Sequence, residues 1–393
     1  MNADEIKLIK RERAEINPEL LQKFDCDTAE SVNAFHRTFP EYTETPLVSL
    51  ADFAAENGVS SVYIKDESFR FGLNAFKVLG SSYAVGRLLA EKLNIPADEL
   101  SFARLTSPEI REKLKNVTFI SATDGNHGRG LAWTAARLGA KSVILMPKGS
   151  ARERLENIRA LGAEAYITDL NYDDTVRLAA KKADENGWIF VQDTAWDGYE
   201  EIPLRIMQGY ITMGSELKNQ LPEKPTHIFL QAGVGAMAGA MAGFFTNLYT
   251  EDKPKVIIVE PHNAACIYKT AEANDGKIHK VDGALETIMA GLSCGEPCSI
   301  GYKLICSCAD YYISMPDEVA MLGMRLLAKP CNGDKTVVSG ESGAAGFGML
   351  AELLLNPEFT DVKDMLGIDE NSIILCISTE GDTDKENYRR IVG

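Results

Sequence analysis

The sequence predicts an α/β protein made of open, twisted, parallel-type sheets that helices cover. Nine short runs rich in β-branched residues recur along the chain, and longer stretches with helical spacing separate them, which is the alternation of parallel sheets. A chain of 393 residues is also long enough for two domains. The predicted strands are 61–65, 117–121, 141–146, 163–168, 188–192, 226–231, 255–260, 311–315 and 372–378, and the clearest predicted helices are 75–93, 128–139 and 152–162.

Composition and charge exclude several classes of function. The formal net charge of -16 argues against a nucleic-acid partner and against an anionic membrane surface. No apolar run approaches the roughly 20 residues of a membrane helix, and the first 20 residues lack the apolar core of an export signal. We therefore expect a cytoplasmic protein that acts on a small molecule, with most of its eight cysteines as free thiols.

The first candidate for chemistry is Lys77, which lies near the start of a predicted apolar helix in the segment NAFKVLG. One interpretation is a lysine whose aliphatic stem lies on the core while its amine reaches water. The other is a partly desolvated amine with a lowered pKa, which suits Schiff-base chemistry. Spacing alone leaves both interpretations open.

A second candidate is the turn ATDGNHGRG at residues 122–130, where a predicted strand leads into a helix. Its glycines allow close approach of the backbone to a ligand, and the amides of the following helix can hold an anion. Asp124, Asn126 and His127 place three polar side chains on this turn. The alternative is an ordinary turn that Asp124 or Asn126 caps.

The third and fourth candidates also follow predicted strands. After strand 226–231, Gly233, Gly235 and Gly239 open a helix in a G-x-G-x-x-x-G pattern, which predicts a phosphate cradle or, alternatively, close helix packing. Strand 372–378 ends in the hydroxyls of Ser378 and Thr379, which can bond a ring nitrogen or simply begin a turn.

A metal site is not expected. Cys294, Cys298, Cys306 and Cys308 have the spacing C-x3-C-x7-C-x-C, which differs from the paired C-x2-C of common structural zinc sites.

The order of these motifs along the chain resembles the fold type II pyridoxal-phosphate enzymes, which include threonine and serine dehydratases, cysteine synthases and tryptophan synthase β-subunits. The resemblance covers nearly all of residues 40–390. The chain resembles the diaminopropionate ammonia-lyases more specifically. Asp124 stands where the general dehydratases have a small residue, and the glycine cradle contains fewer glycines than theirs. The segments that carry this narrower match are NAFKVLG (74–80), ATDGNHGRG (122–130), QDTAWDGY (192–199), TIMAGLSCGEP (287–297) and STEGDTD (378–384).

The resemblance implies a role for each matching residue. Lys77 matches the Schiff-base lysine, and Asn126 matches the asparagine that bonds the phenolic oxygen of the cofactor ring. Ser378 matches the residue that faces the pyridine nitrogen, with Thr379 as the alternative. Asp124 and Asp193 are the further acid–base candidates, with Asp124 serving the D-isomer. The implied phosphate-binding loop is Gly233, Val234, Gly235, Ala236 and Met237.

The same resemblance implies the architecture and the reaction. A large domain of residues 1–77 and 196–393 would bind the cofactor phosphate, a small domain of residues 78–195 would be inserted in it, and the active site would lie between them. The expected reaction is α,β-elimination of D- or L-2,3-diaminopropionate to pyruvate and two ammonia in a homodimer that uses pyridoxal 5'-phosphate. The alternatives are a serine or threonine dehydratase of the same fold or a non-enzymatic binding protein.

Overall fold

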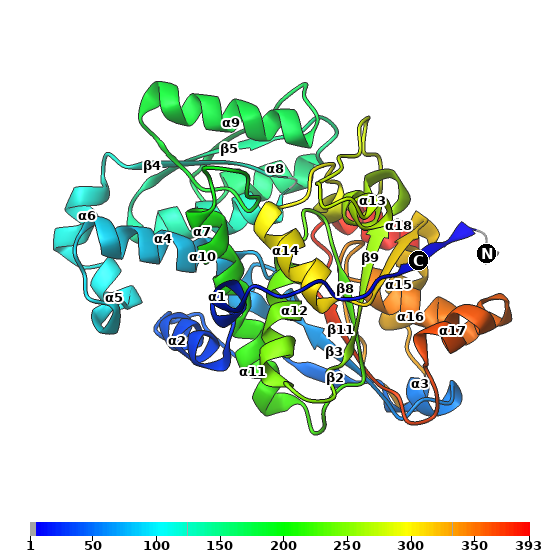
Figure 1. Ribbon diagram of the computed structural model, residues 1–393. Helices are drawn as coiled ribbons and strands as arrows, with labels where there is room; N and C mark the ends of the chain where they lie inside the picture. Colours follow the sequence, from blue (N-terminus) through cyan, green and yellow to red (C-terminus); the bar gives the residue numbers. More distant parts are fainter. Residues whose placement is uncertain (1–4, 124, 332) are drawn as a thin grey trace.

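The computed structural model describes residues 5–123, 125–331 and 333–393, which form two sheets with helices packed around each (Figure 1). The seven-stranded sheet has the order β1-β10-β9-β8-β11-β3-β2, and the four-stranded sheet has the order β6-β5-β4-β7. Across the described part of the chain, no helix has the length and apolar character needed to cross a membrane.

The large sheet is parallel through its five central strands, and its two edge strands, β1 and β2, run antiparallel to their neighbours. All five residues of β8 and of β10 are buried, because helices cover both faces of the sheet. The strands are β1 (Lys7–Lys10), β2 (Leu47–Ser49), β3 (Ser61–Asp66), β8 (His227–Gln231), β9 (Lys255–Pro261), β10 (Tyr311–Met315) and β11 (Ile373–Ser378).

The small sheet is parallel throughout, and its strands lie between residues 118 and 190. Its strands are β4 (Thr118–Ala122), β5 (Lys141–Met146), β6 (Glu164–Ile167) and β7 (Ile189–Phe190). The helices near it are α4 (Val78–Lys92), α5 (Phe102–Leu105), α6 (Pro108–Leu114), α7 (Asn126–Leu138), α8 (Arg152–Arg159) and α9 (Tyr172–Asn186). The domain boundaries expected after residues 77 and 195 stay a prediction.

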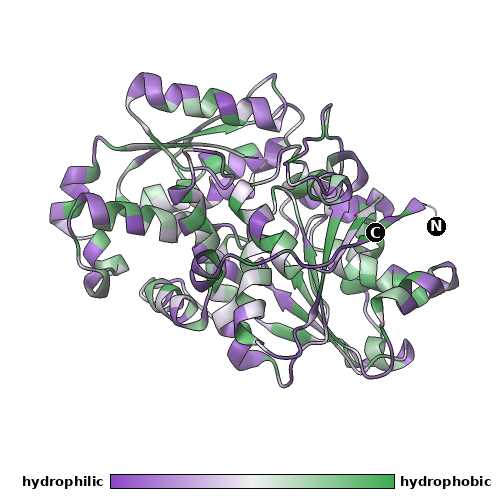
Figure 2. Ribbon diagram, in the orientation of Figure 1, coloured by the Kyte–Doolittle hydropathy of each residue, from purple (hydrophilic) through white to green (hydrophobic). Residues whose placement is uncertain are grey.

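Two apolar clusters fill the interior. One covers a single face of the large sheet, and the other covers its opposite face and continues into the small sheet. Alternate residues of one strand, such as Tyr63 and Ile64, belong to different clusters because successive side chains point to opposite faces. Figure 2 shows the corresponding pattern, with apolar central strands and helices that are hydrophilic on their outer sides.

The remaining helices pack on the large sheet or connect its strands. The α-helices are α1 (Pro18–Gln22), α2 (Cys26–Arg37), α3 (Ala51–Glu56), α10 (Glu201–Tyr210), α11 (Thr212–Gln220), α12 (Ala236–Leu248), α13 (Cys266–Ala273), α14 (Ser299–Cys308), α15 (Asp317–Ala328), α16 (Ala345–Leu355), α17 (Thr360–Leu366) and α18 (Lys385–Val392). The 3-10 turns are Glu67–Gly72, Ala97–Glu99, His262–Ala264, Ala290–Leu292 and Pro357–Phe359.

All nine predicted strands overlap a strand of the structure, with ends that differ by no more than two residues at the carboxyl side. The strands β1 and β2 were not predicted from the sequence. Both are short edge strands, and β1 (KLIK) carries a lysine at each end, so neither shows the continuous apolar run of the central strands.

Candidate active site

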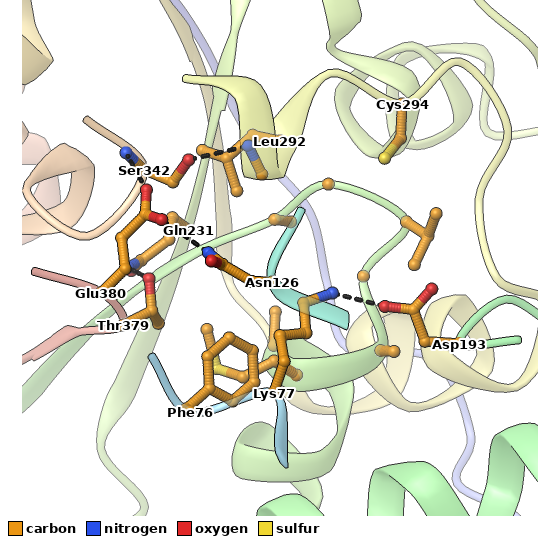
Figure 3. Close-up of a pocket in the computed structure, with 18 of the residues that line it drawn as sticks. Phe76, Lys77, Asn126, Asp193, Gln231, Leu292, Cys294, Ser342, Thr379 and Glu380 are labelled. Carbon is orange, nitrogen blue, oxygen red and sulfur yellow. Dashed lines mark hydrogen bonds and ion pairs between the residues drawn. The ribbon is translucent and has the colours of Figure 1, made fainter. Parts of the chain in front are cut away.

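The carboxyl ends of β4, β8 and β11 converge on one cavity, which the segments before α4 and after β7 also line (Figure 3). The site residues predicted from sequence that line it are Lys77, Asn126, Asp193, Gly233, Val234, Gly235, Ala236, Met237 and Thr379. Ser378 does not line it, and Asp124 lies outside the described residues. Segments more than 300 residues apart in sequence therefore meet at the position that parallel α/β folds reserve for ligands.

Lys77 is the residue immediately before α4, and its side chain is only 15% exposed. Its neighbours Phe76 and Val78 are buried, so the aliphatic stem is surrounded by apolar groups. The amine donates a hydrogen bond to the carboxylate of Asp193 and forms an ion pair with it. Figure 3 shows the Lys77 amine pointing towards Asp193, among the side chains that line the cavity. Lys77 thus places an amine in a mostly enclosed site, where loss of its proton would make it a nucleophile.

Asp193 is a buried carboxylate that follows β7. Burial by itself raises its pKa, but the adjacent Lys77 ammonium outweighs burial and holds the pKa of Asp193 well below its usual range. The Oδ1 atom also accepts hydrogen bonds from the Tyr172 hydroxyl at 3.3 Å and from the Gln192 amide at 3.2 Å. Asp193 is therefore a fixed negative charge within reach of the Lys77 amine.

The turn after β4 places Asn126 at the first position of α7, with its amide directed into the cavity. Its Nδ2 atom donates to the carboxylate of Glu380 at 2.6 Å. The turn is held by the Thr123 hydroxyl, which accepts from the backbone N–H groups of Gly125 and Gly128 at 2.9 and 3.0 Å. Among the described residues, the Asn126 side chain bonds Glu380 and not a backbone N–H group of α7.

The glycine loop after β8 presents backbone amides to the cavity. Gly235 has φ +87°, a left-handed conformation that glycine adopts without strain, and α12 starts at the next residue. A Cβ on Gly233 would lie 3.0 Å from the Gly291 carbonyl oxygen, so a larger residue would crowd the loop. The first amides of α12 have no intrahelical acceptor and sit at the positive end of the helix, an arrangement that binds phosphate.

Ser378 is the last residue of β11 and Thr379 follows it; Thr379 lines the cavity and Ser378 does not. Adjacent residues at the end of a strand face opposite sides, and the Ser378 hydroxyl donates to the Ser339 hydroxyl at 2.8 Å. Thr379 accepts a hydrogen bond from the Gln231 amide at 3.1 Å, which leaves its own O–H available to donate. The geometry therefore favours the alternative, Thr379, over Ser378 as the partner of a ring nitrogen.

The cavity residues that were not predicted from the sequence include Tyr172, Gln231, Ser342 and Glu380. Gln231 is the last residue of β8 and Glu380 lies two residues beyond β11. Their positions at the ends of buried strands could have indicated that they belong to the site. Tyr172 and Ser342 have no such signal. They reach the cavity only because α9 and the segment before α16 pack beside it.

Together these groups form a site for a phosphate-bearing aldehyde cofactor: an enclosed amine, a phosphate cradle, an amide donor and a hydroxyl donor. The Oε1 atom of Gln231 is buried at the cavity wall without a hydrogen-bond partner among the described residues, as expected for a polar group that faces a ligand. A family model described as pyridoxal-phosphate dependent enzyme matches residues 38–367. Fold and site thus define a pyridoxal-phosphate-dependent enzyme.

Comparison with individual proteins narrows this class. The chain is 52% identical to the diaminopropionate ammonia-lyase of Salmonella typhimurium over 377 residues, which are 95% of this chain and 93% of the relative. A crystal structure of the Escherichia coli diaminopropionate ammonia-lyase with an aminoacrylate-PLP azomethine reaction intermediate matches with a TM-score of 0.90 and 45% identity, covering 98% of this chain and 96% of that one. The chain belongs to the diaminopropionate ammonia-lyase family of pyridoxal-phosphate-dependent enzymes.

A second structure of the Escherichia coli enzyme contains D-serine and matches with a TM-score of 0.89 and 45% identity, over 98% of this chain and 96% of that one. The expected fold type II architecture is confirmed by these similarities, and pyridoxal 5'-phosphate is confirmed as the cofactor of the family to which the chain belongs.

Proposed function

We propose that this enzyme eliminates ammonia from D- and L-2,3-diaminopropionate and releases pyruvate and a second ammonia. The observation that carries the proposal is the Lys77–Asp193 ion pair in a cavity that also presents the glycine loop. The 52% identity to a diaminopropionate ammonia-lyase over 95% of the chain supports the same substrate.

When bound, pyridoxal phosphate supplies an electron sink that stabilises negative charge at the α-carbon of an amino acid. The residues proposed to hold it are the Gly233–Met237 loop at the phosphate, Asn126 at the phenolic oxygen and Thr379 at the ring nitrogen. Lys77 would hold the cofactor covalently until a substrate amine displaces it. Once released, its amine takes the α-proton from the face of the substrate on which it stands.

Asp193 explains why a diamino acid suits this site. Its carboxylate is buried, and its pKa is held low by the Lys77 ammonium. When the Lys77 amine acts as a base it must be neutral, so that carboxylate loses its positive partner, and a buried unpaired charge is costly. The β-ammonium of diaminopropionate restores a cation beside Asp193, whereas the hydroxyl of serine does not. Asp193 then keeps the leaving amino group protonated.

Asp124 is the proposed base for the D-isomer. The α-protons of the two isomers lie on opposite faces of the bound substrate, and one base does not reach both. Asp124 lies outside the described residues, and the proposal rests on its place in the sequence, directly before Gly125 in the turn that leads to Asn126. The D-serine bound to the Escherichia coli enzyme supports access of D-amino acids to this type of site.

The decisive experiment compares pyruvate release from both isomers of diaminopropionate, from serine and from threonine. We expect kcat/KM for diaminopropionate to exceed that for serine about 10- to 100-fold, the value of one charge-assisted contact. A larger kcat/KM for serine or threonine would support the dehydratase alternative, and no turnover of any of them would contradict the proposal.

We further propose a homodimer in the cytoplasm. The resemblance to fold type II enzymes supports the dimer, and the buried thiols Cys298, Cys308 and Cys376, none of them in a disulfide, suit a reducing compartment. Light scattering of the purified protein at several concentrations tests the dimer, which a mass of one chain at all concentrations would contradict.

A further inference from the structure

Glu380 is a buried carboxylate at the cavity wall that the proposed chemistry does not use. Three hydrogen bonds end on it: Asn126 Nδ2 donates to Oε2 at 2.6 Å, the Thr383 hydroxyl donates to the same atom at 3.0 Å, and the Ser342 backbone N–H donates to Oε1 at 3.1 Å. No lysine, arginine or histidine of the described residues forms an ion pair with it. Three donors without a cation hold this negative charge in place.

These contacts fix the orientation of one amide. A carboxylate that receives three donors acts only as an acceptor, so the side chain of Asn126 must turn its NH2 group, and not its oxygen, towards Glu380. One N–H is then used by Glu380. The second N–H of the same planar group has no acceptor among the described residues, and Asn126 lines the cavity. Figure 3 shows Glu380 and Asn126 meeting at the cavity wall opposite Asp193.

The backbone around Glu380 also holds the segment that leads to Lys77. Ala75 and Glu380 form an isolated antiparallel bridge. On either side of it, the Phe76 N–H donates to the Thr379 carbonyl at 3.1 Å and the Gly381 N–H donates to the Asn74 carbonyl at 3.0 Å. One short stretch after β11 thus contacts both the lysine segment and the asparagine turn.

We propose that Glu380 is a positioning residue for the cofactor: it aims the free N–H of Asn126 at the phenolic oxygen of the ring, in register with Lys77. This inference rests on the proposed role of Asn126. It predicts that the carboxylate matters through Asn126, and not through its own contact with substrate or through global stability.

The test measures cofactor affinity and the cofactor spectrum of purified enzyme, neither of which requires substrate. Glu380→Gln gives Asn126 a partner that can donate as well as accept, so the amide is no longer held in one orientation. We expect the dissociation constant of pyridoxal phosphate for the apoenzyme to rise about 10- to 100-fold, as for loss of a hydrogen bond to a charged group. The ratio of the two tautomeric absorption bands of the bound cofactor should change as well.

Asp382→Asn is the matched control. Asp382 lies in the same turn and accepts from the Asn74 amide at 2.9 Å, but it does not line the cavity. We expect its affinity and its band ratio to match those of the unmodified enzyme. Equal changes in both variants would show a general disturbance of the turn and would overturn the proposal.

A double-mutant cycle shows whether Glu380 acts through Asn126. Asn126→Ala should weaken the affinity for pyridoxal phosphate as Glu380→Gln does. The dissociation constant of the double variant should exceed that of the weaker-binding single variant by no more than about threefold. Fully additive losses of cofactor affinity would overturn the proposal. Normal affinity and an unchanged spectrum in Asn126→Ala would also overturn it, and this result can be obtained even if Glu380→Gln does not fold. Activity of the unmodified enzyme on diaminopropionate tests the proposed function separately.

Discussion

The amine of Lys77 and the carboxylate of Asp193 form an ion pair across 116 positions of sequence, inside the cavity where β4, β8 and β11 end. Lys77 precedes α4, and Asp193 follows the shortest strand of the small sheet. The pair joins the proposed nucleophile, Lys77, to a buried carboxylate that faces its amine.

Lys77→Ala tests the nucleophile. Turnover of diaminopropionate should fall at least about 1000-fold, because alanine has no amine that could bind the cofactor covalently. Borohydride reduction of the unmodified enzyme should place the cofactor mass on the Lys77 peptide in a mass-spectrometric map. Lys92→Ala, at the exposed end of the same helix, is the control and should keep normal turnover. Labelling of another lysine would contradict the assignment of Lys77 as the lysine that binds the cofactor.

The two aspartates should differ in their effect on the isomers. Asp124→Asn keeps size but removes a base, so kcat for D-diaminopropionate should fall at least about 100-fold, and the L-isomer should lose much less. Asp193→Asn should lower kcat for both isomers to a similar extent, because both isomers carry the distal amino group. Asp197→Asn, on the exposed loop near Asp193, controls for charge. The comparison uses separate kinetics on each pure isomer; retention of D-activity in Asp124→Asn would contradict the role.

The glycine loop can be tested with two glycines of equal conformation. Gly235 and Gly162 both have φ +87°, but a Cβ on Gly235 would lie 2.9 Å from Ile305, whereas a Cβ on Gly162 would meet nothing within 4 Å. Gly235→Asp should raise the cofactor dissociation constant at least about 100-fold, because the added side chain would press on Ile305 and displace the loop that presents the amides. Gly162→Asp carries the same backbone strain and should keep normal affinity. Fluorescence titration of the apoenzymes measures both, and similar affinities would place the cradle elsewhere.

His36 predicts a loss of stability in mild acid. Its ring is fully buried, its Nε2 contacts the Leu79 carbonyl oxygen at 3.1 Å, and its Nδ1 contacts the Thr212 hydroxyl at 2.7 Å. Burial, with the Arg70 cation nearby, lowers the pKa of His36 to about 3. Between pH 6.5 and about 3 the unfolded chain therefore binds a proton that the folded chain does not. The free energy of unfolding should fall as pH falls through this window.

Urea unfolding at pH 7 and pH 5 measures this effect. From pH 6.5 to 5 the contribution of His36 amounts to about 2 kcal/mol. The glutamine of His36→Gln takes up no proton in either state. The drop in its unfolding free energy between pH 7 and pH 5 should therefore be smaller by that amount than the drop in the unmodified protein. The same pH dependence in both proteins would rule His36 out as the cause.

The sequence by itself determined the alternation of strands and helices, the family and four of the segments that build the site. Each of these depends on local pattern: continuous apolar runs for buried strands, glycines where the chain needs positive φ, and a lysine among apolar residues. The edge strands β1 and β2 were missed because short, partly polar strands are defined by the neighbour with which they pair.

Tertiary structure alone decided which side chains meet. The choice of Thr379 over Ser378 depends on which face of β11 looks into the cavity, and one residue of register reverses that face. The Lys77–Asp193 pair and the Asn126–Glu380 hydrogen bond join residues 116 and 254 positions apart. No local pattern encodes such contacts, because they arise only when separate strands end at the same edge and the packing of the helices fixes the distances between them.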